Sequence, residues 1–523
     1  SISMNKKLYI ILACFFAQQV SAQTPEDALR LSWTTPSGTA RNQAIGGTMG
    51  SLGGEITSTF VNPAGLGFYK NSEFVITPAY RVSKTKGAFR GSDAMTLGNV
   101  SNINLGTSGF VWGWSDKYSK WKSKAVSLAI NRMADFKQDI YYSGSNDFSS
   151  FSEQFAEEFS NSGLPINADL TNASLTAGTK LAVYTYLIDT ATINGIKQVV
   201  GLPQRNAFMQ NQNALLNQEN HIVTSGGVSE IALGFATNMD DKLFLGGSLG
   251  VPIVNYERNS LYRESDASGN NNNNFNYSTF RQSYTSKGVG LNAKLGVIFK
   301  PVEYVRLGFA IHSPSIYGLK DTYSASMATD LENYFGSSSG YDSIGLKTIT
   351  GNDQEQFKYD LVTPFKFIVS GSYVFREVED ITRQRGFITA DIEYVNHKWS
   401  NFSASEQNTD DSYYKGVNDD IDAVYRGAFN FRVGGELKFK TIMTRLGFAY
   451  FGSPYQEKEL KARRMNLSGG LGYRNKGIFI DLTYVHQLNK DVNFPYRLGD
   501  KANTFANLKE TTGNIVLTVG FKI

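Results

Sequence analysis

The chain has 523 residues, of which 41% are hydrophobic and 13% aromatic, and its formal net charge is only +4. So small an imbalance, without a basic stripe, excludes the electrostatic footprint of a nucleic-acid-binding protein. The single cysteine is Cys14, which excludes a disulfide framework, a thiolate zinc site and a thiol nucleophile from the rest of the chain.

The first 22 residues have the features of a secretory signal peptide. Two lysines, Lys6 and Lys7, precede an apolar run at 8–17, and the small residues at 20–22 permit cleavage before residue 23. The alternative, a lipid anchor on Cys14, is disfavoured because the apolar run before that residue is short. We therefore predict a signal peptide over 1–22 and an exported protein.

Residues 23–72 form a glycine-rich segment without regular alternation, densest at 46–54 and 62–67. Such glycine density permits tight, irregular backbone. The segment contains neither a phosphate-binding loop nor a dinucleotide-binding glycine pattern. On this evidence alone it could be a linker, a periplasmic tail or a plug.

From residue 73 onward, oily residues alternate with small or polar ones. In the run 515–523, Ile515, Leu517 and Val519 share one face, and the runs 429–439, 305–312 and 445–450 repeat the pattern. Successive side chains of a strand point to opposite faces. The second face carries glycine, alanine and isolated charges, which suits a crowded barrel interior with lipid outside rather than a soluble sandwich.

Strand-like segments and their connections give the architecture. We count about fourteen segments, starting near residues 74, 103, 124, 221, 243, 278, 304, 359, 386, 429, 444, 465, 477 and 511. Short connections (238–241, 300–303, 440–442, 475–476) alternate with long ones (about 145–220, 315–358, 400–428, 489–510). Outer-membrane barrels have short periplasmic turns and long extracellular loops. We predict an all-β fold, a 14-stranded antiparallel transmembrane β-barrel over 73–523.

The longest loop contains one clear helical pattern. Phe151, Phe155 and Phe159 recur every four residues and predict an amphipathic helix, and 206–218 predicts a second, polar one. The helix could cover a small core of the loop itself or form the outer lip of a ligand entrance. The asparagine run 270–274 is low-complexity and predicts a mobile loop tip.

The sequence Asn62-Pro63-Ala64-Gly65-Leu66, ahead of the first strand, resembles the hatch motif of the FadL long-chain fatty-acid transporter family, which includes aromatic-hydrocarbon channels. The similarity continues at 308–314, 391–399, 429–438, 445–454 and 467–473. It implies a monomeric barrel blocked by an N-terminal hatch (23–72), with uptake through an external groove and release through the side wall. It assigns a gate role only to Asn62, Pro63 and Ala64.

Two departures from the family, the insert 145–220 and the C-terminal Ile523, leave the ligand open. A hydrophobic ligand would require a pocket with apolar walls and few polar groups. We expect Asn62 to hydrogen-bond the wall and Pro63 to fix the local backbone. The simpler alternative is that Asn62-Pro63 is merely a turn.

Isolated charges fall on the predicted inward faces of several strands. We expect them to pair with each other and with the hatch, because unpaired buried charge is costly. Alternatively, one arginine or lysine receives a ligand carboxylate. These residues are Lys366, Arg306, Arg432, Arg445, Asp391, Glu393, Glu436 and Lys438.

The leading function is passive transport of small hydrophobic molecules, of fatty-acid or hydrocarbon type, across the outer membrane. The expected partners are outer-membrane lipid and the ligand, without cofactor, metal or nucleic acid, and the expected state is a monomer. The alternatives are a scaffold or partner subunit of a secretion or assembly complex, and a haem-type receptor. The four histidines, His221, His312, His397 and His486, are too far apart to favour the receptor.

No catalytic residues are predicted, because no Ser/His/Asp spacing has a supporting context. Two questions stay open at this stage: which ligand is carried, and whether the wall opens sideways. A kinked wall strand near 124–144 would favour the sideways route.

Overall fold

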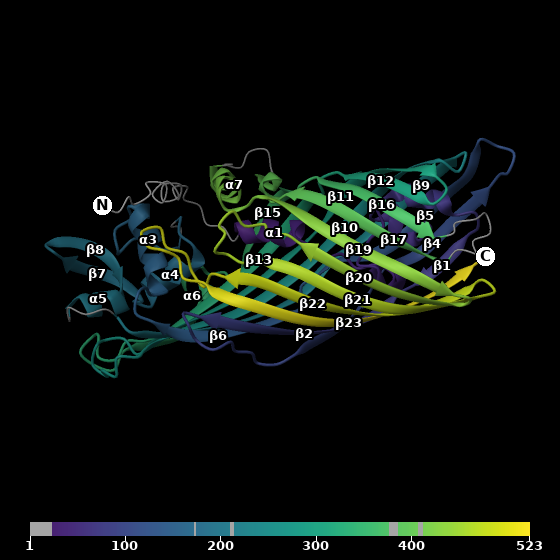
Figure 1. Ribbon diagram of the computed structural model, residues 1–523. Helices are drawn as coiled ribbons and strands as arrows, with labels where there is room; N and C mark the ends of the chain where they lie inside the picture. The colour runs from purple at the N-terminus through teal and green to yellow at the C-terminus, as the bar shows by residue number, and fades with distance from the viewer. Residues whose placement is uncertain (1–22, 172–173, 210–213, 376–384, 406–411) are drawn as a thin grey trace, which may run out of the picture.

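The computed structural model describes residues 23–171, 174–209, 214–375, 385–405 and 412–523, and the predicted signal peptide 1–22 lies outside them. The molecule is an elongated barrel with short helices inside it and a helical cap at one end (Figure 1). Within the described ranges, no helix is long and apolar enough to span a membrane.

The wall is a closed antiparallel barrel of 14 strands, as predicted. Six wall strands consist of two consecutive segments: β1 (Glu73–Ile76) with β2 (Pro78–Phe89), β3 (Val100–Leu105) with β4 (Ser108–Ser115), β5 (Trp121–Asp135) with β6 (Gln138–Asn146), β12 (Val305–His312) with β13 (Ile316–Asp330), β15 (Glu355–Val362) with β16 (Lys366–Phe375), and β17 (Gly386–Asn396) with β18 (Asn401–Ala404).

The other eight wall strands are continuous: β9 (Leu216–Met239), β10 (Leu243–Asp266), β11 (Tyr277–Val302), β19 (Gly427–Phe439), β20 (Ile442–Phe451), β21 (Arg463–Asn475), β22 (Ile478–Asn493) and β23 (Ala506–Lys522). The ring closes where β1 pairs with β23, in a register that places Phe74 opposite Phe521. The barrel therefore has no free edge at the junction of its first and last strands.

An apolar band surrounds the outside of the barrel. On β10 the outward residues run from Leu245 to Ile253 and are apolar and exposed, whereas the next outward residues, Asn255 and Glu257, are polar. A band of about nine residues matches the roughly 9–11 residues of a tilted membrane-spanning strand. The wall is therefore that of a transmembrane barrel of the outer-membrane type.

The extracellular ends of several strands extend beyond this band, so two connections are shorter than predicted. The predicted loop 315–358 contains the wall strand β13, and the connection predicted at 489–510 is confined to 494–505, between β22 and β23. Above the membrane the outward face of a strand can be polar, as at Ser324 and Ser326 of β13. The alternation that marks a lipid-facing strand is therefore lost there.

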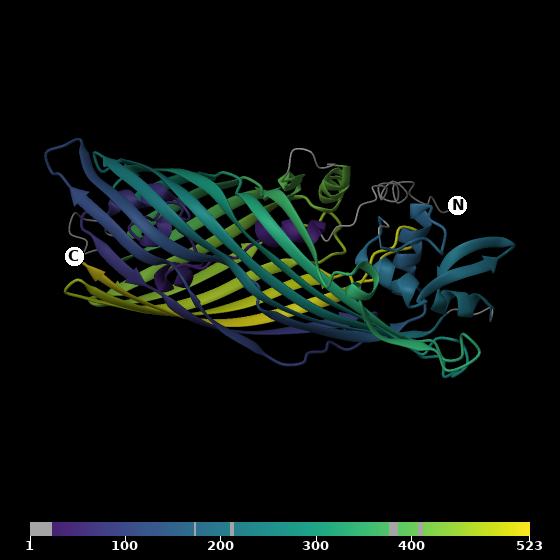
Figure 2. The ribbon, with the colours of Figure 1, turned by 180° about the vertical axis from the view of Figure 1, so that it is seen from behind.

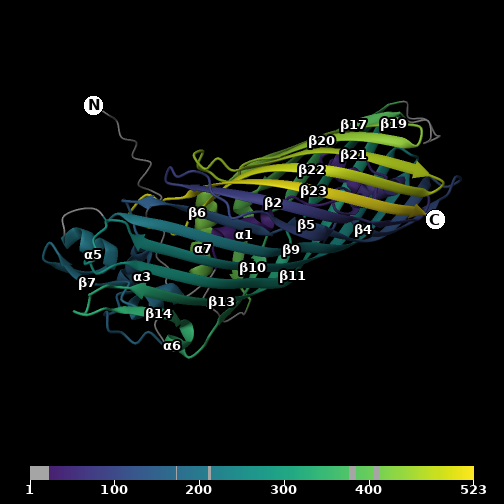
Figure 3. The ribbon, with the colours of Figure 1, turned by 90° about the horizontal axis from the view of Figure 1, so that it is seen from below.

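The insert between β6 and β9 forms a cap on the extracellular end. It contains α3 (Ser152–Ser162), α4 (Ala177–Tyr184), the hairpin β7 (Ile188–Ile193) and β8 (Ile196–Gly201), and α5 (Leu202–Met209). Two elements of the loop after β13, β14 (Gly340–Gly345) and α6 (Leu346–Thr350), complete it. The view from below shows this cap beside the ends of β9, β10 and β11 (Figure 3).

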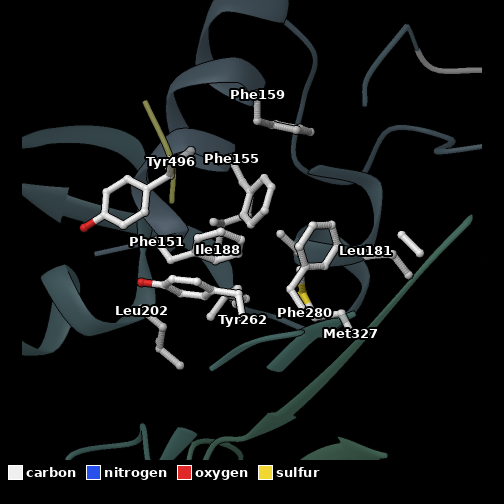
Figure 4. Close-up of a cluster of buried hydrophobic side chains, with 14 of the residues drawn as sticks. Phe151, Phe155, Phe159, Leu181, Ile188, Leu202, Tyr262, Phe280, Met327 and Tyr496 are labelled. Atoms are coloured by element: carbon white, nitrogen blue, oxygen red, sulfur yellow. The ribbon is translucent and has the colours of Figure 1, made fainter. Parts of the chain in front are cut away.

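The predicted helix at 151–159 is confirmed as α3, and Phe151, Phe155 and Phe159 are buried in one apolar cluster with wall residues (Figure 4). The ring of Phe151 stacks on Tyr262 of β10 at 4.1 Å. The second predicted helix, 206–218, is found only in part: α5 ends at Met209, residues 210–213 lie outside the described ranges, and β9 begins at Leu216. Its C-terminal part instead supplies alternating inward residues to the wall.

Candidate functional site: a plugged lumen beside an interrupted wall

The segment before β1 occupies the lumen, as the hatch prediction required (Figure 2). It contains α1 (Pro25–Ser32), α2 (Ala40–Ala44) and two 3-10 helices, η1 (Ile56–Thr59) and η2 (Pro63–Phe68). The start of α1 follows the usual signals, a threonine N-cap, proline at the first helical position and two acidic residues in the first turn.

Asn62 joins the hatch to the wall. Its side-chain oxygen accepts from the Ala64 amide at 3.1 Å and so caps η2. Its side-chain nitrogen donates to the carbonyl of Gly50 at 2.6 Å, and lies 3.3 and 3.4 Å from the carbonyls of Val297 (β11) and Phe309 (β12). The expected bond to the wall and the turn interpretation therefore both describe this residue.

Glycines on the inner wall let the hatch lie directly against the strands. A Cβ added at Gly296 would lie 1.8 Å from the Asn62 side-chain oxygen, and one at Gly246 would lie 2.4 Å from the Ala64 nitrogen. Any larger side chain would displace η2, whose Ala64 packs against Phe244. The inner face that carries small residues in the sequence is thus the surface on which the hatch rests, here called the hatch seat.

Six of the eight inward charges pair with each other or with the hatch, as predicted. The Asp391 carboxylate accepts from the amides of Met49 and Gly50 at 3.0 and 3.1 Å. Arg445 lies between Glu436 and Asp481, 2.5 Å from each. Arg432 pairs with Glu393 at 3.0 Å, and Arg306 donates to the carbonyl of Leu52.

Two histidines of the wall also hold the hatch, a contact that the sequence analysis did not predict. His312 lies 2.7 Å from the carbonyl of Val61, and His397 lies 3.0 Å from the hydroxyl of Ser32 in α1. Within the part of the chain that the structure describes, no group of three or more His, Cys, Asp or Glu side chains could hold a metal ion.

A cavity of about 570 Å³, here called the lumen pocket, lies between α1 and the wall. Its apolar lining includes Leu29 and Trp33 of the hatch, Phe136 and Ile140 of the wall, and Phe151 of the cap. The helix α7 (Ser412–Val424) packs against α1 in a shared apolar cluster. The phenylalanine helix α3 therefore borders the pocket as well as covering its own core.

The lumen pocket is more polar than a hydrocarbon site requires, and the prediction of few polar groups is wrong. The charged lining residues are Arg30, Arg81, Arg132, Arg258, Arg464, Arg497, Glu26, Asp135, Asp491 and Glu510. Most of these pair, but Arg258 has no carboxylate partner in the described ranges, and its guanidinium lies 5.1 Å from the ring of Tyr284. The sequence analysis missed these arginines because the strands that carry four of them extend above the apolar band, while Arg30 lies in α1 and Arg497 in the connection 494–505.

The wall is interrupted on one side of the lumen pocket. β3 pairs with β2, but in the described part of the chain no ladder joins β3 to β5 or β6. Pairing of β4 with β5 ends at Ile130, and beyond it β5 and β6 pair only with β9. We call this region, residues 100–105 facing 131–140, the wall interruption.

A bend in the third wall strand produces the interruption. The ladder between β5 and β9 shifts register near Arg132, and the strand breaks between β5 and β6, where the Phe136 amide donates to the carbonyl of Gly226 at 3.0 Å. Gly226 has φ +91°, and a Cβ there would lie 2.0 Å from the carbonyl oxygen of Asn255. Only glycine fits, so the bend is built into the wall.

Few contacts cross the wall interruption. Asn102 donates to Asp135 at 2.6 Å, and Arg81 of β2 lies 3.3 Å from the same carboxylate. Above it the ring of Phe89 packs on Tyr142 at 5.5 Å. Since Asp135 also lines the lumen pocket, the pocket reaches the interruption from inside.

Comparison with known proteins supports the architecture. No protein-family model matches the sequence, and no curated protein is significantly similar to it. The structure is similar to that of a Pseudomonas aeruginosa FadL homologue, with 13% identity, a TM-score of 0.52, and coverage of 94% of this chain and 99% of that chain. A TodX monoaromatic hydrocarbon channel carrying the deltaS2 mutation gives 12% identity, a TM-score of 0.51, and coverage of 93% and 98%.

At this level of identity the likeness concerns the fold. Both proteins match over nearly their whole length, so the hatch and the complete barrel are shared rather than a part of the wall. The chain therefore has the fold of the FadL-type hatch-plugged transmembrane barrels.

Proposed function

We propose that the protein is a passive outer-membrane channel for small amphiphilic molecules of the fatty-acid type, with an apolar body and an anionic end. The observation that carries the proposal is the lumen pocket, which is lined by both apolar side chains and arginines and reaches the wall interruption beside the hatch. A FadL homologue and a monoaromatic hydrocarbon channel share the fold, so hydrophobic molecules are the first ligands to test.

The route follows from the bonding around the pocket. The hatch is hydrogen-bonded to the wall on several sides, through Asn62, Asp391 and His312. A ligand that left through the base would have to break these bonds together, whereas Asn102 and Arg81 cross the wall interruption to a single carboxylate, that of Asp135. We propose lateral release into the bilayer, with Asn62, Pro63 and Ala64 holding the hatch closed.

The lining of the lumen pocket favours an amphiphile over a bare hydrocarbon. Burial stabilises a ligand at roughly 25 cal/mol per Å² of apolar surface, but only where apolar walls replace water. A hydrocarbon would also displace water from Arg258 and Arg464 without replacing its hydrogen bonds. A carboxylate facing these guanidinium groups would restore them.

We propose no catalytic role and a monomeric state. A scaffold role would need a partner-binding surface, and neither the apolar band nor the cap indicates one in the described ranges. A haem-type receptor would need convergent ligands, yet His312 and His397 are engaged with the hatch, and His221 is 2.9 Å from Asp139.

Uptake into proteoliposomes tests the proposal. Vesicles containing the protein should take up radiolabelled oleate several-fold faster than empty vesicles, with a smaller gain for toluene and none for glucose. Arg258→Gln combined with Arg464→Gln should reduce the oleate gain and leave the toluene gain unchanged. Equal rates with and without protein for all hydrophobic probes would contradict the proposed function.

A further inference from the structure

A second apolar depression lies on the outside of the barrel, far from the lumen pocket. It is a groove of about 910 Å³ that crosses β17, β19, β20, β21 and β22, which lie side by side in the wall (Figures 1 and 3). Outward aliphatic and aromatic side chains line it: Ile388, Leu437, Leu446, Leu471, Leu482 and Tyr484. We call it the outer groove.

One row of residues across the strands explains its shape. The ladders place Gly435 opposite Leu446, and Leu446 opposite Gly469. The outward sides of both glycines lack a side chain, so Leu446 stands between two furrows and is 75% exposed. With strands about 4.8 Å apart, the furrows are about 10 Å apart, one on each side of Leu446.

The depth of the outer groove restricts what can occupy it. Leu446 lies five residues from the turn residue Thr441. At about 3.3 Å per residue and a tilt near 40°, this places the groove about 12 Å above the periplasmic turns, within the inner half of a hydrocarbon core about 30 Å thick. Only an acyl chain or another membrane-embedded surface can reach it.

The turns below the outer groove carry positive charge that no carboxylate in these turns balances. Lys440 and Lys476 are exposed turn residues with φ of +55° and +48°, and the Arg474 amide donates to the carbonyl of Thr441 at 3.0 Å, which joins the two turns. The nearest carboxylates of these strands, Glu436 and Asp481, face the lumen and are occupied by Arg445.

Turns elsewhere on the periplasmic rim differ. The turn between β9 and β10 contains Asp240 and Asp241 beside Lys242, and the one between β11 and β12 contains Lys300 and Glu303. Among the described turns, those that are basic and have no acidic neighbour thus join the strands that form the apolar furrows. Juxtamembrane basic residues attract anionic lipid headgroups.

We infer that the outer groove is a binding site for one anionic phospholipid of the inner leaflet. Its phosphate lies between Lys440 and Lys476, and its two acyl chains occupy the furrows on either side of Leu446. The site is independent of the lumen pocket and of the transported ligand.

Native mass spectrometry of the purified protein tests the inference, with dioleoyl phosphatidylglycerol and dioleoyl phosphatidylcholine as probes. The unmodified protein should bind phosphatidylglycerol at least fivefold more tightly. Lys440→Gln with Lys476→Gln should remove this preference, because each basic residue near the headgroups is worth about fivefold. Lys242→Gln, in an equally exposed turn, is the matched control and should keep it.

Filling a furrow tests the chain-binding part. Gly469→Leu should weaken retention of both lipids several-fold, whereas Gly371→Leu, on the outward side of β16 with nothing within 4 Å of the added Cβ, should not. Equal binding of the two lipids by the unmodified protein would overturn the inference. This outcome does not depend on whether Gly469→Leu folds. Disulfide-linked dimers of Leu446→Cys in native membranes would overturn it too, by assigning the groove to a second copy.

Discussion

The hatch seat and the wall interruption are two parts of the plugged barrel, and they are built in opposite ways. At the seat, Asn62 bonds both within the hatch and to wall strands, and Asp391 accepts two hatch amides. At the interruption no ladder joins β3 to β5 or β6 in the described ranges, and Asn102 and Arg81 reach across to a single carboxylate.

The difference indicates where the barrier is weakest. A buried hydrogen bond stabilises the fold by about 1 kcal/mol net, and leaving one of its partners unsatisfied costs more. Moving the whole hatch would break several such bonds at once, so its cost is a multiple of the cost of one bond. At the interruption, Asn102 and Arg81 would have to release the Asp135 carboxylate, so fewer bonds would break there. We therefore propose that the plug is a static seal and that the wall is the part that opens.

Deleting residues 62–65 should have the largest effect, because it removes η2 from its glycine seat and opens an aqueous path. We expect the swelling rate of proteoliposomes in small sugars to rise at least tenfold. Deleting the loop tip 270–274 is the matched control and should leave the rate unchanged. A deletion that left both sugar permeation and oleate uptake unaltered would show that the seal lies elsewhere.

Arg445→Met should cause the largest loss of stability from a single substitution. It leaves Asp481 without its cation and Glu436 with only Arg41 at 3.5 Å, and breaking a buried ionic network typically costs about 3–5 kcal/mol. The measurement is urea unfolding in detergent micelles. Arg258→Met, which removes a cation without a carboxylate partner, should cost less than about 1 kcal/mol. Similar losses in the two variants would contradict the pairing seen in the lumen.

Asn62→Ala should loosen the hatch without loosening the wall. The variant loses the cap of η2 and strands carbonyls that Asn62 satisfied, at a cost of about 1–3 kcal/mol. Hydrogen exchange should therefore accelerate in 50–66 and stay unchanged in β11 and β12. Faster exchange throughout the wall would mean that the barrel needs the hatch to hold its shape.

The smallest effect concerns the cap, where Glu157 of α3 accepts from the Gly499 amide at 2.9 Å. Burial, together with the carboxyl group of Asp500, raises the pKa of Glu157 to about 7. A raised carboxyl pKa means that the folded contact binds a proton more tightly than the open one, so it weakens as pH rises through 7. Proteolysis in the connection 494–505 should speed up between pH 6 and pH 8, and Glu157→Gln should reduce this difference. An unchanged pH dependence in the variant would assign the effect to another group.

The wall and the hatch could be predicted from the sequence, whereas the lumen pocket could not. Lipid outside and a crowded lumen inside impose strict alternation, so Ile515 and Leu517 indicate a strand by themselves. The Asn62-Pro63-Ala64 motif likewise indicated the hatch. Above the membrane that constraint disappears, which is why β13 was assigned to a loop and the pocket arginines were missed.

The wall interruption could not have been predicted from local pattern. It depends on a register shift near Arg132 and on Gly226, one of 50 glycines in the chain, whose special role exists only because Asn255 lies against it. Tertiary contacts, not local propensity, make one glycine indispensable and another replaceable.

The central claim is that ligand leaves through the wall interruption and not through the hatch. Two locked variants separate the routes. Asn102→Cys with Asp135→Cys, bridged by a short bifunctional thiol reagent, closes the interruption, and Ser51→Cys with Ser372→Cys, whose hydroxyls lie 2.6 Å apart, fixes the hatch by a disulfide.

The measurement is oleate uptake by proteoliposomes before and after each lock is formed. The account predicts at least a tenfold loss when the interruption is bridged, recovered when the bridge is cleaved, and unchanged uptake when the hatch is locked. Loss of uptake on locking the hatch, with normal uptake through a bridged wall, would contradict it.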